Sequence, residues 1–397
     1  MMIKKKAEEI AEYAYKNVPV YIRIAEEKGI RPGETDFFDY PVTDKSMFLD
    51  SGTSTLSMEY MGKYAAGKLR WLRTSGSTGK FTEVYWDEKE YQKSLLPLWL
   101  YRKKYYGIMP DDKMCYFYAS DKETDDFYEK GSVLGITKNF VSEGKMSKAY
   151  QMVLDYDPVW MILQPSVAVL LCEVVQQEGL QILPSLRYIE FTGEYLEDSV
   201  RQKVESVFGC MTANQYGSKE VNSIAYECPE GNLHCMGTNV YLESMEDNML
   251  CVTTLQNKGM PLVRFCIGDR GELIENVSCK CKNKNPILKL LTGRDNDWIA
   301  GRDGKKYHAH CVMHIVHTIN YRADGVILQY QIIQKDFDTF LYKLVLEDLD
   351  AKEEIEKQVV SEIKNRFGKH AKIEFEFLEH LIPDEKTGKL RCFIKDF

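Results

Sequence analysis

Residues 72–86 read LRTSGSTGKFTEVYW, and the interpretation of the whole chain starts from this stretch. A run of hydroxyl-bearing residues and glycines stands directly before a lysine, between an apolar approach and a β-branched, aromatic exit. Such a run offers little apolar surface to a core, but its hydroxyls, backbone N–H groups and ammonium suit a phosphate group. A solvated turn is the simpler alternative. The candidate phosphate-binding residues are Thr74, Ser75, Gly76, Ser77, Thr78, Gly79 and Lys80.

Length and composition describe a globular protein of more than one domain. A chain of 397 residues exceeds the usual size of a single hydrophobic core, so we expect two domains. Hydrophobic residues make up 44% and charged residues 28%, which is ordinary for a soluble fold. The net charge of −8 argues against a nucleic-acid partner, because proteins that bind the phosphate backbone usually present a basic surface.

The chain shows neither a membrane span nor a signal peptide. No stretch approaches the roughly 18 uninterrupted apolar residues that a span needs, and the segment MMIKKKAEEIAEYAYKNV alternates charged and apolar residues with helical spacing. Eleven cysteines without an export signal predict mostly reduced thiols. We therefore expect a cytoplasmic protein with no membrane partner.

Helical and strand-like segments alternate along the first half of the chain. The helical segments are 3–15, 88–106, 164–177 and 199–207, and the strand segments are 114–118, 160–163 and 186–191. This alternation predicts an α/β fold with a parallel or mixed sheet covered by helices, and ligand sites at the carboxyl ends of strands. Residues 239–275 contain strands separated by turns, which predicts a β-rich subdomain.

The last hundred residues predict a separate, small α+β domain. Apolar strands near 325–333 and 340–346 precede a helix at 351–367 and a strand at 372–378. The polar, flexible sequence TGRDND suits a domain boundary. We therefore expect a large domain of residues 1–293 and a small, mobile C-terminal domain of residues 294–397.

Six segments, in a fixed order, resemble the core motifs of the adenylate-forming superfamily of acyl-CoA synthetases. The resemblance is greatest to phenylacetate-CoA ligases and their relatives, and it spans most of the chain. The segments are TSGSTGK (74–80), FTGEYL (191–196), NQYGSKE (214–220), VRFCIGDRGEL (263–273), TGRDNDW (292–298) and TGKLR (387–391).

The resemblance implies how ATP is bound. Gly193 and Glu194 match the loop that lines the adenine pocket, and Tyr216, beside Gly217, would stack on the adenine ring. Asp269 would accept hydrogen bonds from both ribose hydroxyls, since a carboxylate can accept two such bonds at once. The run that ends at Lys80 would surround the β- and γ-phosphates.

The resemblance also implies catalytic roles for charged residues. Glu220 would hold Mg²⁺ at the phosphates, because a hard cation prefers oxygen ligands. Lys389 matches the mobile catalytic lysine, which would pair with the carboxylate and the α-phosphate as charge builds during adenylation. Arg294 would contact the ribose.

Two positions depart from the usual motifs. Lys219 stands where relatives have Ser or Thr, so it offers a cation to the α-phosphate in place of a hydroxyl. Asn296 stands at the hinge between the domains, where relatives have Asp or Lys.

A group of cysteines and a histidine forms a candidate metal site. The segment CPEGNLHC supplies Cys228 and His234, and CKC supplies Cys279 and Cys281. The resemblance extends to phenylacetate-CoA ligase relatives with a structural zinc, and four such ligands complete a closed tetrahedron. Cys235 is a substitute ligand. Reduced cysteines without metal are the alternative.

The motifs together predict an acid–thiol ligase. ATP would activate a carboxylic acid, with a small aryl acid favoured, to an acyl-adenylate, and coenzyme A would then take the acyl group as a thioester. Loading onto the phosphopantetheine of an acyl carrier protein is an alternative acceptor reaction, and a nucleotide-binding homologue without turnover is another alternative. The oligomeric state is left open, with a homodimer as one option.

Overall fold

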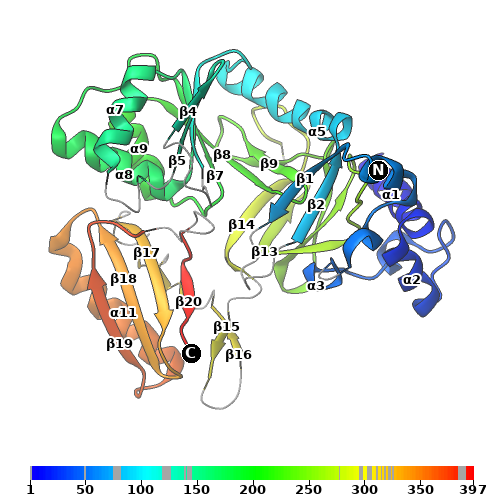
Figure 1. Ribbon diagram of the computed structural model, residues 1–397. Coiled ribbons are helices and arrows are strands. Elements are labelled where there is room, and N and C mark those ends of the chain that lie inside the picture. The colour runs from blue at the N-terminus through cyan, green and yellow to red at the C-terminus, as the bar shows by residue number, and fades with distance from the viewer. Residues whose placement is uncertain are drawn as a thin grey trace. The chain divides into compact units, whose positions relative to one another are not determined.

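The computed structural model describes most of the chain as two compact units (Figure 1). Unit 1 comprises residues 1–109 and 215–291, and unit 2 comprises residues 110–214 and 292–397. The predicted division between residues 293 and 294 stays a prediction. The described residues are 2–48, 51–74, 82–118, 127–137, 140, 145–276, 278–294, 298–301, 306–309, 312–313, 315–316, 319–320, 323, 326–382 and 390–397.

Unit 1 combines N-terminal helices with antiparallel strands. Its helical elements are α1 (Met2–Asn17), α2 (Pro19–Lys28), η1 (Phe37–Asp39), α3 (Lys45–Phe48), η2 (Gly52–Thr55), η3 (Met58–Tyr60), α4 (Met61–Ala65), α5 (Glu88–Tyr101), η4 (Arg102–Tyr106) and η5 (Glu246–Asn248). Its strands are β1 (Leu69–Thr74), β2 (Thr82–Asp87), β9 (Asn222–Glu227), β10 (Leu233–Cys235), β11 (Val240–Ser244), β12 (Met249–Thr254), β13 (Phe265–Ile274) and most of β14 (Ile287–Arg294). Strand β8 (Met211–Ser218) runs along the chain from unit 2 into unit 1.

The strands of unit 1 form a hairpin and part of a larger sheet. Strands β1 and β2 pair antiparallel, and the larger sheet has the order β11-β12-β13-β14-β10-β9-β8 in this unit. Helix α1 packs on it through Ala7, Ala11 and Ala14, which are fully buried and recur at helical spacing. Small side chains at these positions let the helix lie close to the strands.

Unit 2 begins with a mostly parallel sheet in the order β7-β6-β3-β5-β4. Strands β7, β6, β3 and β5 pair in parallel, and β4 pairs antiparallel with β5. Figure 1 shows the helices of this part, in green, beside these strands. The elements are β3 (Met114–Tyr118), β4 (Phe127–Lys130), β5 (Val133–Thr137), α7 (Met146–Tyr156), β6 (Trp160–Leu163), α8 (Pro165–Glu178), β7 (Tyr188–Thr192) and α9 (Asp198–Phe208).

The C-terminal part of unit 2 is a small α+β structure with a core of its own. Its four-stranded sheet has the order β19-β18-β17-β20, and helix α11 lies along one face (Figure 1). Ile355, Val359 and Ile363, four residues apart on α11, are buried in that core. The elements are β15 (Trp298–Ala300), β16 (Lys306–His308), β17 (Ile327–Gln334), β18 (Thr339–Leu346), η6 (Leu349–Ala351), α11 (Lys352–Phe367), β19 (Lys372–Phe377) and β20 (Phe393–Lys395).

The predicted fold class is confirmed. The structure has a mixed α/β sheet covered by helices, strands separated by turns within 239–275, and a small C-terminal sheet with one long helix. Among the helices that the structure describes, none combines the length and apolar character that crossing a membrane demands. The cytoplasmic location stays a prediction.

Candidate functional site

The structure brings two predicted nucleotide-binding residues into direct contact. The hydroxyl of Tyr216, on β8, donates a hydrogen bond to Oδ2 of Asp269, on β13, over 2.8 Å. The pair is part-buried. An aromatic ring beside a carboxylate suits a nucleoside, because the ring can stack on a base and the carboxylate can accept bonds from hydroxyls. The individual roles of the two residues stay predictions.

Local irregularities in the strands position this pair. The pairing of β12 with β13 shifts between Met249 and Cys251, opposite the part of β13 that contains Asp269. Gly268, directly before Asp269, has φ +78°, a left-handed conformation that residues with side chains rarely adopt. Bulges of this kind redirect side chains and are common beside functional sites.

Gly217, directly after Tyr216, lies where strands β8 and β9 approach closely. A Cβ atom at this position would stand 2.3 Å from the carbonyl oxygen of Asn222, so no other residue fits without backbone movement. The pairing of β8 with β9 shifts at the same point. The glycine in the motif is therefore a steric requirement of the strand pair that carries Tyr216.

Glu220 is buried and forms an ion pair that the sequence did not reveal. Its Oε1 lies 3.0 Å from Nζ of Lys45, on α3, and only 5% of Glu220 is exposed. Burial alone would raise the pKa of this carboxyl, but the Lys45 ammonium and the hydrogen bonds to the carboxylate lower it below its ordinary value. Glu220 is therefore ionised at neutral pH, as a Mg²⁺ ligand must be. Its neighbour Lys219 is exposed.

The loop after β7 contains the other described part of the predicted ATP site. Gly193 has φ +85°, which turns the chain sharply at the carboxyl end of the strand. The carboxylate of Glu194 then accepts hydrogen bonds from the backbone N–H and the hydroxyl of Ser166, each over 2.9 Å. Ser166 lies in the first turn of α8. Glu194 is therefore fixed by contacts that the motif did not indicate.

Several predicted residues lie outside what the structure describes. Thr74 and Arg294 end strands β1 and β14, but their side chains are not among the described atoms. Their roles stay predictions. The predicted residues outside the described part are Ser75, Gly76, Ser77, Thr78, Gly79, Lys80, Asn296 and Lys389.

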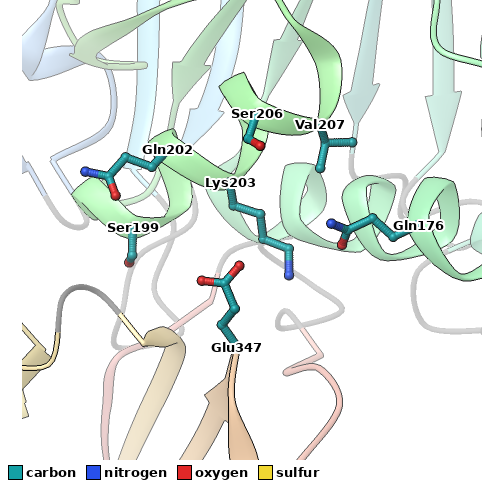
Figure 2. A pocket seen from close by; sticks show the side chains of 7 residues that line it. All are labelled: Gln176, Ser199, Gln202, Lys203, Ser206, Val207 and Glu347. Atoms are coloured by element: carbon teal, nitrogen blue, oxygen red, sulfur yellow. The ribbon is translucent and has the colours of Figure 1, made fainter.

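A polar pocket of about 210 Å³ lies elsewhere in unit 2. Figure 2 shows that the side chains of Lys203, on α9, and Glu347, after β18, point toward one another across it. None of the described residues that line it belongs to the predicted nucleotide site. The lining residues are Gln176, Ser199, Gln202, Lys203, Ser206, Val207 and Glu347.

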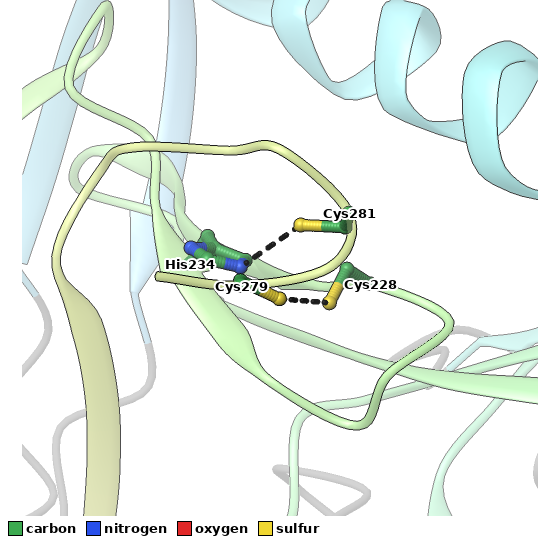
Figure 3. A group of neighbouring side chains, drawn as sticks. All are labelled: Cys228, His234, Cys279 and Cys281. Atoms are coloured by element: carbon green, nitrogen blue, oxygen red, sulfur yellow. Dashed lines mark hydrogen bonds between the residues drawn. The ribbon is translucent and has the colours of Figure 1, made fainter. Parts of the chain in front are cut away.

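The predicted metal ligands converge in unit 1. The ligand atoms of Cys228, His234, Cys279 and Cys281 all lie within 4.8 Å of one another (Figure 3). Sγ of Cys228 lies 3.8 Å from Sγ of Cys279, and Sγ of Cys281 lies 3.3 Å from Nε2 of His234. A tetrahedron with Zn–S bonds of about 2.3 Å has edges of about 3.8 Å, whereas a disulfide would place the sulfurs about 2.0 Å apart. The spacing therefore suits a closed tetrahedral site.

A backbone contact orients the histidine toward the three thiols. Nδ1 of His234 lies 3.1 Å from the carbonyl oxygen of Asn285, which can only accept a hydrogen bond. Nδ1 therefore carries the proton, and Nε2 presents its lone pair to the cluster. Cys235 follows His234 in β10 and lies in the hydrophobic core, because successive side chains in a strand point to opposite faces. The structure thus groups His234, and not Cys235, with the cluster.

The thiols of the cluster have unequal acidities. Burial raises the pKa of Cys228 to about 12. Burial acts in the same direction on Cys279, but the surrounding hydrogen bonds, led by the one from the backbone N–H of Cys281, outweigh it and lower the pKa of Cys279 to about 6. Asn232 also donates to Sγ of Cys279 over 3.4 Å. The hydrogen bonds around Cys279 therefore favour its thiolate, which is the form that binds metal.

Tyrosine rings line the loop that carries Cys281. Tyr101 and Tyr105 stack with ring centroids 5.5 Å apart, and Tyr101 also stacks on Tyr226 at 6.0 Å. The amide of Asn283 donates to the hydroxyl of Tyr101 over 3.2 Å. Burial and then the Cys281 thiol raise the pKa of Tyr105. The cluster thus adjoins a stack of aromatic rings.

Sequence comparison places these features among known proteins. The family description for the CapK C-terminal domain matches residues 299–396. Protein CapK of Staphylococcus aureus is 30% identical over 212 residues, which span 51% of this chain and 45% of CapK, less than half of that protein. The phenylacetate-coenzyme A ligase of Thermus thermophilus is 23% identical over 416 residues, covering 98% of this chain and 88% of that protein. The chain is thus similar to the phenylacetate-coenzyme A ligases, in one case over nearly its whole length.

The fold of the chain is also similar to that of a solved CoA ligase. A structure of 2-hydroxyisobutyryl-CoA ligase in the postadenylation state, in complex with R3-HIB-AMP, matches with a TM-score of 0.76 at 17% identity. The match covers 99% of this chain and 89% of that one. The predicted relationship to the adenylate-forming superfamily and its phenylacetate-CoA ligase group is confirmed.

The sequence motifs do not indicate several residues that contact the predicted site residues from distant parts of the chain. Lys45 precedes its partner Glu220 by a long stretch of chain and stands in an ordinary polar sequence, so no local signal identifies it. The same holds for Ser166, which meets Glu194 across the fold, and for Asn285, whose carbonyl orients His234. Only the tertiary structure reveals these partners.

Proposed function

We propose that the protein activates a carboxylic acid with ATP and Mg²⁺ and transfers the acyl group to coenzyme A. A carboxylate oxygen attacks the α-phosphorus, the bond to the bridging oxygen breaks, and pyrophosphate leaves with the electron pair. The thiol then attacks the acyl carbonyl and AMP leaves. The homology to CoA ligases supports this type of reaction, and the contact between Tyr216 and Asp269 is the observation in the chain that carries it.

Each predicted site residue would have its own role in this reaction. Tyr216 and Asp269 bind the nucleoside, and the segment that ends at Lys80 binds the β- and γ-phosphates. The ionised Glu220 contributes an oxygen ligand to Mg²⁺, which offsets phosphate charge. Lys389 stabilises the charge that develops at the α-phosphate.

The second half-reaction would need a rearrangement. The C-terminal domain, residues 294–397, would turn about Asn296 to admit the thiol, while the closed site protects the mixed anhydride from water. Lys219 would supply a cation near the α-phosphate.

We further propose that the Cys/His cluster binds one structural Zn²⁺. Three thiols and an imidazole fill all four positions of a tetrahedral ion, which leaves no open position for a substrate. The cluster joins the β9–β10 turn to the segment between β13 and β14. Its ion would therefore stabilise the strands that carry Asp269.

The favoured substrate is a small aryl acid, because the relative matched over nearly the whole chain is a phenylacetate ligase. The test is carboxylate-dependent exchange of radioactive pyrophosphate into ATP. The panel should include phenylacetate, benzoate, 2-hydroxyisobutyrate and a fatty acid, with Asp269→Ala as the inactive control. Exchange with an aryl acid supports the proposal, and no exchange with any acid contradicts it.

The thiol product identifies the acceptor. Mass spectrometry should find an acyl-CoA when the active acid, ATP and coenzyme A are combined. An acylated phosphopantetheine on an added carrier protein, without acyl-CoA, would instead support carrier loading. ATP binding without pyrophosphate exchange would support a nucleotide-binding homologue without turnover, and size-exclusion chromatography would test the homodimer.

A further inference from the structure

The carboxylate of Glu194 joins two segments of unit 2 that are distant in sequence. Its Oε2 accepts from the backbone N–H of Ser166, and its Oε1 accepts from the Ser166 hydroxyl, each over 2.9 Å. Oε1 also accepts from the backbone N–H of Leu390 over 3.0 Å. We call Ser166, Glu194 and Leu390 the Glu194 clamp. One side chain therefore holds both helix α8 and the C-terminal segment.

The position of the clamp explains why a carboxylate suits it. Ser166 is the second residue of α8, and the N-cap residue Gln164 makes no capping bond through its side chain to any residue that the structure describes. Glu194 satisfies a backbone donor at this helix start, where a negative charge is favoured by the helix dipole. The left-handed backbone conformation of Gly193 turns the loop toward the start of this helix.

A second side chain supports the clamp from the C-terminal sheet. Gln329, on β17, is buried, and its amide donates to the carbonyl oxygen of Ser166 over 3.4 Å while accepting from the backbone N–H of Leu381 over 2.8 Å. Leu390 packs on a small cluster of Leu328, Val345 and Leu381. Polar and apolar contacts thus converge on the same segment.

A further hydrogen bond crosses this junction at helix α9. Ser199, in the first turn of α9, donates to the carbonyl oxygen of Ile327 over 3.2 Å. Beyond it lies the polar pocket between Lys203 and Glu347 (Figure 2). Each of these polar bonds can be replaced by a bond to water when the two parts separate.

Leu390 directly follows Lys389, the predicted catalytic lysine. An anchor at Leu390 restricts the position of the preceding residue, since consecutive Cα atoms are about 3.8 Å apart. We propose that Glu194 is a positioning residue for adenylation, which holds the C-terminal segment at Leu390 during the first half-reaction and releases it before thioester formation. The inference rests on the proposed function. Lys389 itself lies outside the described residues, so the clamp is defined by Leu390.

The test uses Glu194→Gln in the full-length protein. The amide keeps the shape of the side chain but loses the charge and turns an N–H toward a donor. Carboxylate-dependent pyrophosphate exchange should fall about tenfold or more, as expected when charge-assisted hydrogen bonds are lost. Transfer of the acyl group from added acyl-adenylate to coenzyme A, which does not use the clamp, should keep its rate to within about twofold.

Hydrogen–deuterium exchange provides a readout that does not depend on activity. The amides of Ser166 and Leu390 should exchange faster in Glu194→Gln than in the parent protein. Glu362→Gln, on the exposed face of α11, makes the same charge change and should alter neither rate nor exchange. Ser166→Ala removes one donor and should show the same pattern more weakly, which keeps the test decisive if Glu194→Gln does not fold.

The outcomes separate the inference from the proposed function. Unchanged amide exchange at Leu390, or an equal loss in both half-reactions, overturns the positioning role. A parent protein that exchanges no pyrophosphate with any acid refutes the proposed function and the adenylation role together, whereas amide exchange still decides whether the anchor exists.

Discussion

The Cys/His cluster and the Glu194 clamp both join segments that are distant in sequence, but they do so with different chemistry. The cluster brings three thiols and an imidazole to the spacing of a tetrahedral ion. The clamp uses three hydrogen bonds to one carboxylate. Metal ligation is slow to break and contributes strongly to folding, whereas hydrogen bonds exchange readily with water. With the proposed ion bound, the cluster would be a permanent connection in unit 1, whereas the proposed clamp would be a reversible one in unit 2.

The largest expected effect is on adenylation, at the C-terminal segment that the Glu194 clamp holds. Lys389→Ala should lower the rate of adenylation about 100- to 1,000-fold, because it removes the charge that we propose stabilises the transition state. ATP affinity and zinc content should stay close to those of the parent protein. Pyrophosphate exchange and calorimetric titration with ATP would measure this. The control is Lys364→Ala, on α11, and parental activity of Lys389→Ala would remove the residue from the mechanism.

At the Cys/His cluster, Cys279→Ser should lower the thermal stability of the protein. Zinc content should fall from about one per chain, and the melting temperature should drop by about 10 °C or more, because a structural ion contributes directly to folding. Metal analysis and thermal unfolding would show both effects. Cys210→Ser changes a cysteine outside the cluster and should leave the zinc in place. Full zinc content in Cys279→Ser would contradict the assignment of this ligand.

A smaller effect is expected at the buried ion pair near the nucleotide residues. Lys45→Met leaves the Glu220 carboxylate without its partner and should destabilise the protein by ~1–2 kcal/mol at pH 7, since Lys45 is partly exposed. The pKa of Glu220 is lowered in the folded protein, so the stabilisation is present above its ordinary pKa of 4.5 and is lost as the pH falls through the lowered value. Melting curves of both proteins should therefore converge in acid. A difference that persists there would exclude this ion pair as its cause.

The smallest effect is expected at Glu197, in the loop that follows the clamp residue. Burial, and then the charge of Asp198, raise the pKa of Glu197 from 4.5 to about 8. The unfolded chain loses this proton at lower pH than the folded protein, so stability declines between pH 4.5 and 8. Glu197→Gln removes the decline and should raise the melting temperature by about 2–4 °C at pH 9, with little change at pH 4. Equal shifts at both pH values would contradict the raised pKa.

Much of the fold could be predicted because the sequence patterns that indicate its helices and strands are local. Strands β3 and β6 were predicted with their observed ends, since each is an apolar run bounded by polar or turn residues. Helix α1 and helix α11 follow the predicted periodicity to within a few residues. Strand β20 was missed, because it is short and depends on parallel pairing with the distant β17.

The candidate sites also contain some residues that could be predicted from the sequence and others that could not. The four cluster residues could be predicted from residue type, but the choice between His234 and Cys235 required the alternation of strand β10. Lys45 and Ser166 could not be predicted, because their roles depend on partners far away in the chain. Resemblance supplied the contact partners Tyr216 and Asp269, whose functions remain to be measured.

The stacked tyrosines beside the cluster would make binding of the proposed metal observable by spectroscopy. Tyr101 and Tyr105 adjoin the loop of Cys281. Replacement of the proposed zinc by cobalt, which absorbs visible light in a tetrahedral thiolate site, should colour the protein and quench the emission of these rings. A spectrometer could then follow the occupancy of this site during catalysis and reveal whether the connection in unit 1 stays intact through every turnover.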